Sequence, residues 1–278
     1  MATTGDPRNF SGSIPEHYDR GLGPVIFADY ATEMAKRVAA AAPRRVLETA
    51  GGTGIVTRAL RDALPAAARL TATDLNAPML EISRAKFRTG EAIEFQPADA
   101  TALPFADAAF DAVVCQLGLM FFPDKDKGHR EALRVLAPGG RYHLSVWDSH
   151  RYNPFARIAH EVVGGFFPVD PPQFYQVPVN CHPIDPLKEA LLSAGFADIR
   201  IAVVALQKTI PDLAAFARGA VYGNPLIDQI RARGGVDPER VVTALTDAFR
   251  REFPADPAQA TAVRMPLQAI FYEAVKPA

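Results

Sequence analysis

The sequence predicts an α/β fold built around a mostly parallel β-sheet with helices on both faces. Two observations carry this prediction. Between residues 43 and 148, short apolar or β-branched segments alternate with helical segments of about ten residues, which is the pattern of repeated βαβ units. The segment DAVVC, residues 111–115, is apolar at consecutive positions after its first residue, as expected of a strand that is covered on both sides.

The individual elements follow from apolar periodicity and from proline and glycine punctuation. A polar stretch, residues 1–12, looks like a loose tail, and a helix is expected over residues 25–42 between Pro24 and Pro43. In the alternating region the expected strands cover residues 44–49, 70–74, 93–96, 111–115 and 142–147. The expected helices cover residues 55–64, 77–87 and 124–136, the last closed by Pro138-Gly139-Gly140.

The rhythm changes after residue 148. Residues 149–183 are rich in proline and aromatic residues, and a helix is expected over residues 185–194, ended by Gly195. Residues 199–207 read as a strand and residues 266–275 as a final strand. Between them, residues 213–253 read as helices that are broken at residues 223–225 and 234–235.

The chain of 278 residues is expected to form one domain, 1–278, because no linker separates its halves. In this interpretation residues 13–42 are an N-terminal helical cap and residues 43–148 are the ligand-binding core. Residues 184–209 and 263–278 complete the sheet, and residues 149–183 and 210–262 are insertions beside it.

Composition excludes several classes of protein. The formal net charge is −1, from 30 basic and 31 acidic residues, so the basic excess typical of nucleic-acid-binding proteins is lacking. Two cysteines are too few for a disulfide framework or a zinc cluster, and the six histidines show no metal-ligand spacing. No apolar run reaches the roughly 20 residues that cross a bilayer, and no signal peptide is evident. We therefore expect a cytoplasmic protein without a metal, a nucleic-acid partner or a membrane span.

The most informative stretch is ETAGGTG, residues 48–54, which leaves a strand and opens a helix. Glycines there let a ligand approach the backbone, and a helix N-terminus offers free N–H groups. Asp74 ends the next strand, where a carboxylate accepts hydrogen bonds from ribose hydroxyls, and Asp99 follows the third strand, where it can accept one from an adenine amine. The carboxyl ends of three successive parallel strands would bring Glu48, Asp74 and Asp99 to one crevice.

Two ligands compete for this loop. A dinucleotide prefers the pattern G-x-G-x-x-G, and here Thr57 stands where the last small residue belongs. Glu48 would also repel a pyrophosphate, whereas it would attract a nucleoside with a cationic tail, such as S-adenosylmethionine (SAM). The charge favours SAM, and a nicotinamide-dependent (NAD(P)) oxidoreductase on the same sheet stays as the alternative.

In order along the chain, the segments VLETAGGTG, TATDLNAPML, PADATALPFADAAFDAVVCQLGLMFFPD and EALRVLAPGGRYHLSVW resemble class I SAM-dependent methyltransferases. The nearest branch includes the ubiquinone/menaquinone-biosynthesis enzymes (methyltransferase type 11/25), and the resemblance covers about residues 16–150. It implies a Rossmann-like, seven-stranded, mostly parallel sheet whose last strand is antiparallel. It also implies methyl transfer from SAM, leaving S-adenosylhomocysteine (SAH), to a small molecule.

The resemblance assigns a set of cofactor-binding residues. They are Tyr18, Glu48, Thr49, Ala50, Gly51, Gly52, Gly54, Asp74, Leu75, Met79, Asp99, Ala100, Gln116 and Leu117. Glu48 would face the methionine amino group, Asp74 the ribose, and Asp99 the adenine amine. Leu75 and Met79 would line the adenine, and Gln116, Leu117 and Gly118 would lie by the methionine portion. The sequence departs from the family at Ala50, where the family usually has glycine, and at Gly51, where it often has cysteine.

The methyl acceptor carries no motif. An apolar pocket is expected from aromatic residues in and near the insertions, namely Phe121, Trp147, Tyr152, Tyr175 and Tyr222. A base is needed only for a protonated acceptor, and the candidates are His143, His182, Tyr152 and Tyr175.

We expect the two insertions to form a lid that excludes water. The competing interpretation makes the helical stretch the interface of a homodimer. A protein that binds SAM without transferring its methyl is a further alternative.

Overall fold

The computed structural model describes residues 6–278, so residues 1–5 of the expected tail lie outside the described range. The chain divides into two compact units. One, called the sheet unit here, comprises Ala28–Trp147, Cys181–Val204 and Ala269–Ala278. The other, the helical unit, comprises the chain up to Phe27, Asp148–Asn180 and Ala205–Gln268.

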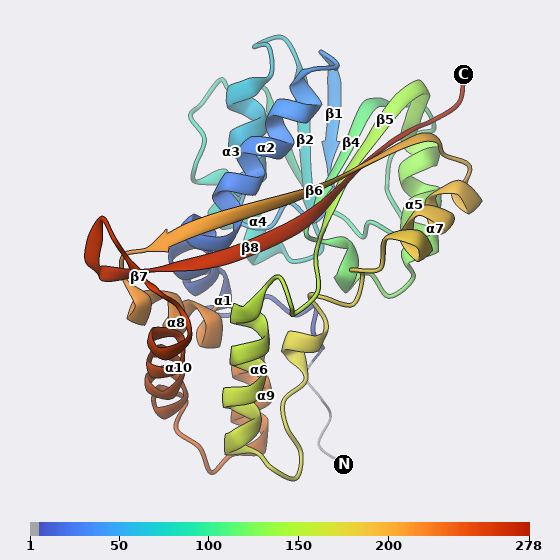
Figure 1. The fold of residues 1–278 in the computed structure, drawn as a ribbon. Helices are drawn as coiled ribbons and strands as arrows, with labels where there is room; N and C mark the ends of the chain where they lie inside the picture. Colours follow the sequence, from blue (N-terminus) through green and yellow to red (C-terminus); the bar gives the residue numbers. More distant parts are fainter. Residues whose placement is uncertain (1–5) are drawn as a thin grey trace. The chain divides into compact units, whose positions relative to one another are not determined.

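The strands form one sheet in the order β3-β2-β1-β4-β5-β8-β6 (Figure 1). Their bounds are β1 Arg45–Glu48, β2 Arg69–Asp74, β3 Ile93–Pro97, β4 Phe110–Gln116, β5 Leu136–Trp147, β6 Ala197–Ile210 and β8 Gln259–Val275. Strands β1 to β5 pair in parallel, and β8 is antiparallel to β5. The predicted seven-stranded sheet with an antiparallel last strand is confirmed. A short additional strand, β7 (Ala255–Asp256), pairs with β8.

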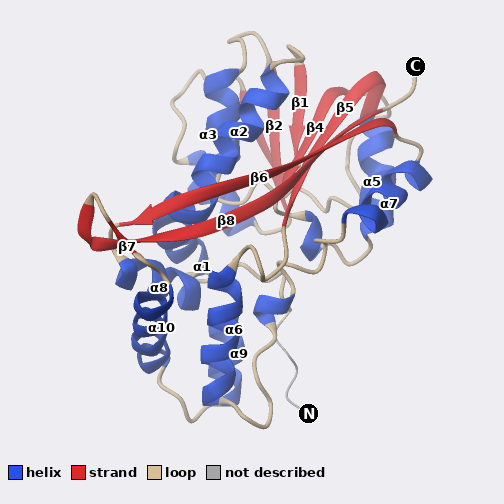
Figure 2. Ribbon diagram, viewed as in Figure 1, coloured by secondary structure: helices blue, strands red, loops and turns tan. Residues whose placement is uncertain are grey.

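Helices cover both faces of the sheet unit (Figure 2). On one face, Tyr30 of α2 (Ala28–Ala39) packs edge-on against Trp147 of β5, with ring centroids 5.6 Å apart. On the other face, His129 of α5 (Lys125–Val135) packs against Tyr142 of the same strand at 6.0 Å. Residues of odd and even number point to opposite sides of a strand, so β5 is buried on both sides, as the sequence predicts. The other helices of this unit are α3 Ile55–Ala63, α4 Ala77–Arg84, η2 Leu119–Phe121 and α7 Ile184–Ala194.

The helical unit has an aromatic core centred on Phe216. Its ring lies 6.1 Å from that of Phe155 and 5.3 Å from that of Phe249. The helices of this unit are α1 Ile14–His17, η1 Tyr18–Phe27, α6 Pro154–Phe166, η3 Phe174–Gln176, α8 Leu213–Tyr222, α9 Leu226–Arg233 and α10 Pro238–Glu252. The breaks between α8, α9 and α10 fall at the predicted residues 223–225 and 234–235.

The N-terminal segment differs from the expectation. The helix predicted to start at residue 25 starts earlier, because Pro24 lies inside η1, a π-helix, rather than at a helix start. Phe10, expected in a loose tail, is buried and packs edge-on against Tyr18 at 5.9 Å. Within the helical unit, a Cβ on Gly21 of η1 would lie 2.7 Å from the Cα of Gly219 in α8, so the two backbones touch there.

Three other features differ from the expectation. Helix α5 ends at Val135, as predicted to within one residue, but β5 begins directly after it rather than at residue 142, because the Pro138-Gly139-Gly140 turn pairs with the chain beyond β8. There the Gly139 N–H donates to the Lys276 carbonyl at 3.0 Å, and the Lys276 N–H donates to the Gly140 carbonyl at 2.9 Å. The proline-rich segment contains α6, which was not predicted, and β8 begins at Gln259 rather than at residue 266. Within residues 6–278, no helix combines the length and the apolar character that crossing a bilayer requires.

Candidate cofactor site

The glycine loop, residues 49–54, is held from both sides by the strands that flank β1. The Thr49 N–H donates to the Val114 carbonyl of β4, and the Gly51 N–H donates to the Thr73 carbonyl of β2, both at 2.8 Å. Three of its residues have positive φ, namely Ala50 (52°), Gly52 (57°) and Gly54 (83°). The loop is therefore fixed by the protein itself, and helix α3 starts directly after Gly54 with its N–H groups at this edge of the sheet.

Asp74, at the end of β2, holds the loop in a second way. One carboxylate oxygen accepts the Gly52 N–H at 2.9 Å, and the other accepts the Asn76 N–H at 2.8 Å. The side chain is only 7% exposed. Burial raises the pKa of Asp74, although the N–H groups of Asn76 and Gly52 oppose that shift. The residue expected to bind ribose therefore also anchors the glycine loop, a task that the sequence did not reveal.

Glu48, the last residue of β1, is a buried acid with unsatisfied hydrogen-bonding capacity. It is 1% exposed, and its Oε2 has no hydrogen-bond partner in residues 6–278. Burial raises the pKa of Glu48 to about 8, the Thr57 hydroxyl lowers it, and the charge on Asp74 raises it further. A buried carboxylate is costly unless a positive group pairs with it.

The expected adenine-side residues differ in burial. Leu75 is 52% exposed, which is unusual for a core leucine, whereas Met79 is buried against the loop, with its Cε 3.6 Å from the position of a Cβ on Gly52. Asp99 is exposed after β3, and its Oδ1 accepts the N–H and the hydroxyl of Thr101, each at 2.8 Å. The neighbouring Ala100 is half-buried.

A second loop follows β4, the strand beside β1. Gln116 is buried at the strand end, and Leu117 adopts a φ of 54°, which is rare for a bulky residue. The Leu117 N–H donates to the Ser145 carbonyl of β5 at 2.9 Å. Burial raises the pKa of the Cys115 thiol to about 11, so Cys115 is an inert core residue. Phe121, in η2, is half-buried.

Besides Phe121, three candidates for the acceptor side belong to the sheet unit. His143 is 1% exposed within β5, and its Nδ1 lies 3.8 Å from a carboxylate oxygen of Glu273 in β8. Burial lowers the pKa of His143 to about 4, against the opposing effect of Glu273. Trp147 is packed against Tyr30, as described above. His182, the third candidate in this unit, is exposed.

The remaining candidates belong to the helical unit. Tyr18 stacks on Phe27, with ring centroids 4.8 Å apart. The hydroxyl of Tyr175 donates to the Ala220 carbonyl and that of Tyr222 donates to Glu239, both at 2.7 Å. Burial raises the pKa of Tyr175 and also that of Tyr222, the latter to about 12, so neither hydroxyl is an effective base near neutral pH. Tyr152 is 43% exposed. Their roles toward a ligand stay predictions.

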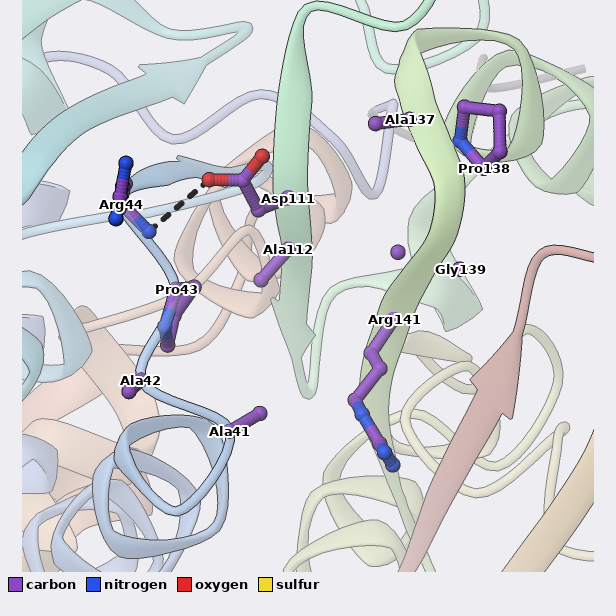
Figure 3. A pocket seen from close by; sticks show the side chains of 11 residues that line it. Ala41, Ala42, Pro43, Arg44, Asp111, Ala112, Ala137, Pro138, Gly139 and Arg141 are labelled. Carbon is purple, nitrogen blue, oxygen red and sulfur yellow. Dashed lines mark hydrogen bonds between the residues drawn. The ribbon is translucent and has the colours of Figure 1, made fainter. Parts of the chain in front are cut away.

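A pocket of about 350 Å³ lies at the opposite end of the same strands, where β1, β4 and β5 begin (Figure 3). It is lined by residues 41–44, 111–112 and 137–141. Its acid, Asp111, accepts the backbone N–H groups of Arg44 at 3.0 Å and Arg45 at 2.9 Å, and also pairs with the Arg45 guanidinium at 2.7 Å. The carboxylate that borders this pocket therefore has its hydrogen bonds satisfied within the fold.

Comparisons with known proteins agree with the loop and sheet order. A family model described as a methyltransferase domain matches residues 47–144. A demethylmenaquinone methyltransferase of Thermus thermophilus is 46% identical over 101 residues, which are 36% of this chain and 46% of that protein. A ubiquinone/menaquinone biosynthesis C-methyltransferase UbiE of Hahella chejuensis is 40% identical over 120 residues, 42% of this chain and 48% of that protein. The match thus spans about half the length of these curated relatives.

The fold has solved counterparts. The structure of phosphoethanolamine N-methyltransferase 2 from Haemonchus contortus in complex with S-adenosyl-L-methionine superposes with a TM-score of 0.59 at 16% identity. The superposition covers 95% of this chain and 57% of that chain. At this identity the likeness concerns the fold alone. The strand order and the glycine loop agree with the methyltransferase domain that matches residues 47–144, so this part of the chain is similar to SAM-dependent methyltransferases.

Proposed function

We propose that the protein binds SAM at the glycine loop and transfers its methyl group to a small molecule. The observation that carries the proposal is Glu48, a buried carboxylate with an unpartnered oxygen beside a rigid glycine loop. A ligand whose end near Glu48 is positively charged would complement that carboxylate, whereas a pyrophosphate would be repelled. The methionine end of SAM carries an ammonium and a sulfonium and no phosphate, so SAM suits the site better than NAD(P).

The residues of the chain would act mainly by binding and orientation. When bound, SAM supplies an electrophilic methyl group on a sulfonium whose departure leaves a neutral thioether. Glu48 would hold the amino group, and Asp74 would hold the ribose while it keeps Gly52 in place. The acceptor must then approach the methyl carbon in line, and fixing that geometry supplies much of the rate enhancement.

A general base is required only if the acceptor arrives protonated. Of the four candidates, His143 and Tyr175 are buried with pKa values displaced away from neutrality, so neither is suited to the task. Tyr152 and His182 are exposed and keep this role open. We therefore favour an acceptor that is deprotonated, or readily deprotonated, in solution.

We propose an apolar aromatic acceptor of the quinol class, methylated at a ring carbon. The relatives that the chain resembles, a demethylmenaquinone methyltransferase and a ubiquinone/menaquinone biosynthesis C-methyltransferase, support this class. The proline- and aromatic-rich residues 149–183 support an apolar pocket. Ring-carbon transfer takes electron density from the deprotonated ring to the methyl carbon, breaks the carbon–sulfur bond, and releases the ring proton to solvent or a base.

The test begins with ligand binding. SAM and SAH should raise the melting temperature of the purified protein, and NAD⁺ and NADPH should leave it unchanged. Stabilisation by a dinucleotide and not by SAM would overturn the proposal in favour of an oxidoreductase. Methyl transfer is then followed with SAM carrying an isotope-labelled methyl and with reduced naphthoquinones, simple phenols and primary amines as acceptors. Binding of SAM without label in any acceptor would instead indicate a protein that uses SAM without transferring its methyl.

A further inference from the structure

Ala50 lies in a backbone conformation that favours glycine. Its φ is 52°, in the left-handed region where the Cβ of an L-residue crowds the backbone. Glycine would adopt this conformation without that penalty. The Cβ of Ala50 raises the free energy of this loop conformation, so we expect a contact of the methyl group that compensates for the strain.

Gly118 presents the converse situation. Its φ is −108°, which any residue adopts, so its backbone does not require glycine. Glycine is required there for lack of space, because a Cβ on Gly118 would lie 2.5 Å from the Cβ of Ala50 and 3.2 Å from the Sγ of Cys115. The first distance is far below a van der Waals contact. Only one methyl group fits between these two Cα atoms, and in this chain Ala50 provides it.

The contact joins the two loops that the methionine portion of SAM would touch. Ala50 follows β1 and Gly118 follows β4, and these strands are parallel neighbours. On one side, the Thr49 N–H ties the first loop to Val114 of β4. On the other, Leu117, itself at a φ of 54°, ties the second loop to Ser145 of β5. The Ala50–Gly118 contact therefore lies between two anchored segments and sets the distance between them.

We propose that the methyl of Ala50, seated on the bare Cα of Gly118, sets the spacing of the two loops and thereby the affinity for SAM. Ala50 and Gly118 are positioning residues, since they act through the backbone of Gly51 and Gly52 on one side and of Leu117 on the other. The inference rests on the proposed function. It explains why residue 50 is an alanine although its backbone conformation favours glycine. It also explains why residue 118 is a glycine although its backbone conformation allows any residue.

The test moves the methyl from one loop to the other. In Ala50→Gly the left-handed strain is relieved, so the melting temperature should hold or rise, while SAM binds about five- to tenfold more weakly because the gap is no longer filled. In Gly118→Ala two methyl groups collide, and both the melting temperature and SAM binding should drop sharply, by at least about tenfold in affinity. The double variant A50G/G118A has one methyl again, and its affinity should return to within about threefold of the wild type once Cys115 yields slightly.

The matched control is Ala108→Gly. Ala108 is also an alanine with positive φ, 57°, but it lies before β4, away from the loop. A108G should show the same relief of strain and no change in SAM affinity. In turnover assays A50G should raise the KM for SAM and leave kcat and the KM for the acceptor near wild-type values.

Two results would overturn the inference. One is an A50G variant that binds SAM as tightly as the wild type. The other is a double variant that unfolds, or that binds no better than A50G does, so that the substitutions combine without rescue. If G118A alone does not fold, the comparison of A50G with the double variant still decides. Should the wild type fail to bind SAM, the proposed function is wrong, yet the rescue of the melting temperature in the double variant still tests the spacing contact.

Discussion

The two ends of β1 and β4 carry acids in opposite conditions. Where the strands begin, Asp111 accepts two backbone N–H groups and pairs with Arg45. Burial disfavours its ionisation, but Arg45 and the two N–H groups outweigh burial, so the pKa of Asp111 is lowered. Where β1 ends, Glu48 is more deeply buried, its Oε2 has no hydrogen-bond partner within residues 6–278, and its pKa is raised to about 8.

Asp111 therefore stabilises the fold, whereas Glu48 has hydrogen-bonding capacity that, in our proposal, a ligand satisfies. Asp111 gains hydrogen bonds on folding and therefore stabilises the native state. Glu48 loses its water and gains little, so it costs stability that a cationic ligand would return on binding. The glycine-loop end combines the unpartnered Oε2 of Glu48 with the left-handed residues Ala50 and Leu117, and such a combination is typical of binding sites.

The largest effect that would separate the two ends comes from removing an acid from each. Asp74→Ala should weaken SAM binding by about a hundredfold, because it would remove the proposed ribose partner and also the Gly52 anchor, each a hydrogen bond to a charged group worth about 1.5–3 kcal/mol. Asp111→Ala should leave the affinity within about twofold and lower the free energy of unfolding by about 1–3 kcal/mol. Calorimetric titration measures the affinity for SAM, and chemical denaturation measures the free energy of unfolding. Equal losses of affinity in both variants would show that the ends do not differ in function.

A smaller change probes the charge of Glu48. Glu48→Gln keeps the shape of the side chain, and affinity for both SAM and SAH should fall by about tenfold, because both carry the ammonium and a hydrogen bond to a charged group is stronger by about 1 kcal/mol or more. The ligand-free variant should be more stable than the wild type above pH 8. If E48Q binds both ligands as the wild type does, Glu48 does not face the ligand.

The pH dependence sharpens the same comparison. Between the unperturbed value of 4.5 and the native value of about 8, folded Glu48 holds a proton that the unfolded chain has released. The free energy of unfolding therefore falls as pH rises through this window, by at most about 1.4 kcal/mol per pH unit from this group. For Asp111 the sign is opposite: its lowered pKa stabilises the fold above pH 3.8, and that contribution is lost as pH falls through the native value.

Ligand binding should reverse the effect at Glu48. A cation beside the carboxylate favours the ionised form, so binding near pH 7 should release a proton and strengthen as pH approaches 8. Titration calorimetry in buffers of different ionisation enthalpy counts that proton. The difference between wild type and E48Q isolates Glu48 from the amino group of SAM itself, which titrates in a similar range, about pH 8. Identical proton counts in the two proteins would contradict the assignment.

The smallest effect is expected at Asp99. It is exposed, and its Oδ1 already accepts two hydrogen bonds from Thr101, so water competes for the contact with a neutral adenine amine. Asp99→Ala should cost about two- to fivefold in affinity, in line with about 0.5–1 kcal/mol for an ordinary hydrogen bond. Leu75→Ala is a companion variant at the other exposed residue expected on the adenine side of the site, and Leu75 and Asp99 together are called the rim here. A loss at Asp99 as large as that at Asp74 would show that the rim is more enclosed than its exposure indicates.

The sequence predicted what local patterns determine. Apolar runs located every major strand, and Gly195, with a φ of 106°, ended α7 where expected. The missed features depend on residues far apart in the chain. Pro24 is typical of a helix start, yet it lies within the π-helix η1, whose Gly21 packs against Gly219. The turn at residues 138–140 is typical of a helix end, yet its backbone hydrogen bonds with Lys276 make it part of the sheet.

The same division holds for the candidate site. The glycine motif and the spacing to Asp74 located the loop and its acids from local sequence alone. The anchoring of Gly52 by Asp74, the unpartnered oxygen of Glu48 and the collision that a Cβ on Gly118 would cause are tertiary features with no sequence signature. The aromatic residues of the acceptor side could be named from composition, but nothing in the sequence showed that Tyr175 and Tyr222 use their hydroxyls to bond within the helical unit.

The position of β8 bears on how the protein is synthesised. β8 lies between β5 and β6 in the sheet, yet it follows both in the sequence, after residues 211–258. During synthesis the parallel strands β1 to β5 emerge first, and the flank of β5 stays open until β8 is released from the ribosome. An open flank of apolar strand is a template for aggregation. The nascent chain should therefore depend on chaperones during this interval, and chains truncated before residue 269 should be more prone to aggregate than the 278-residue chain.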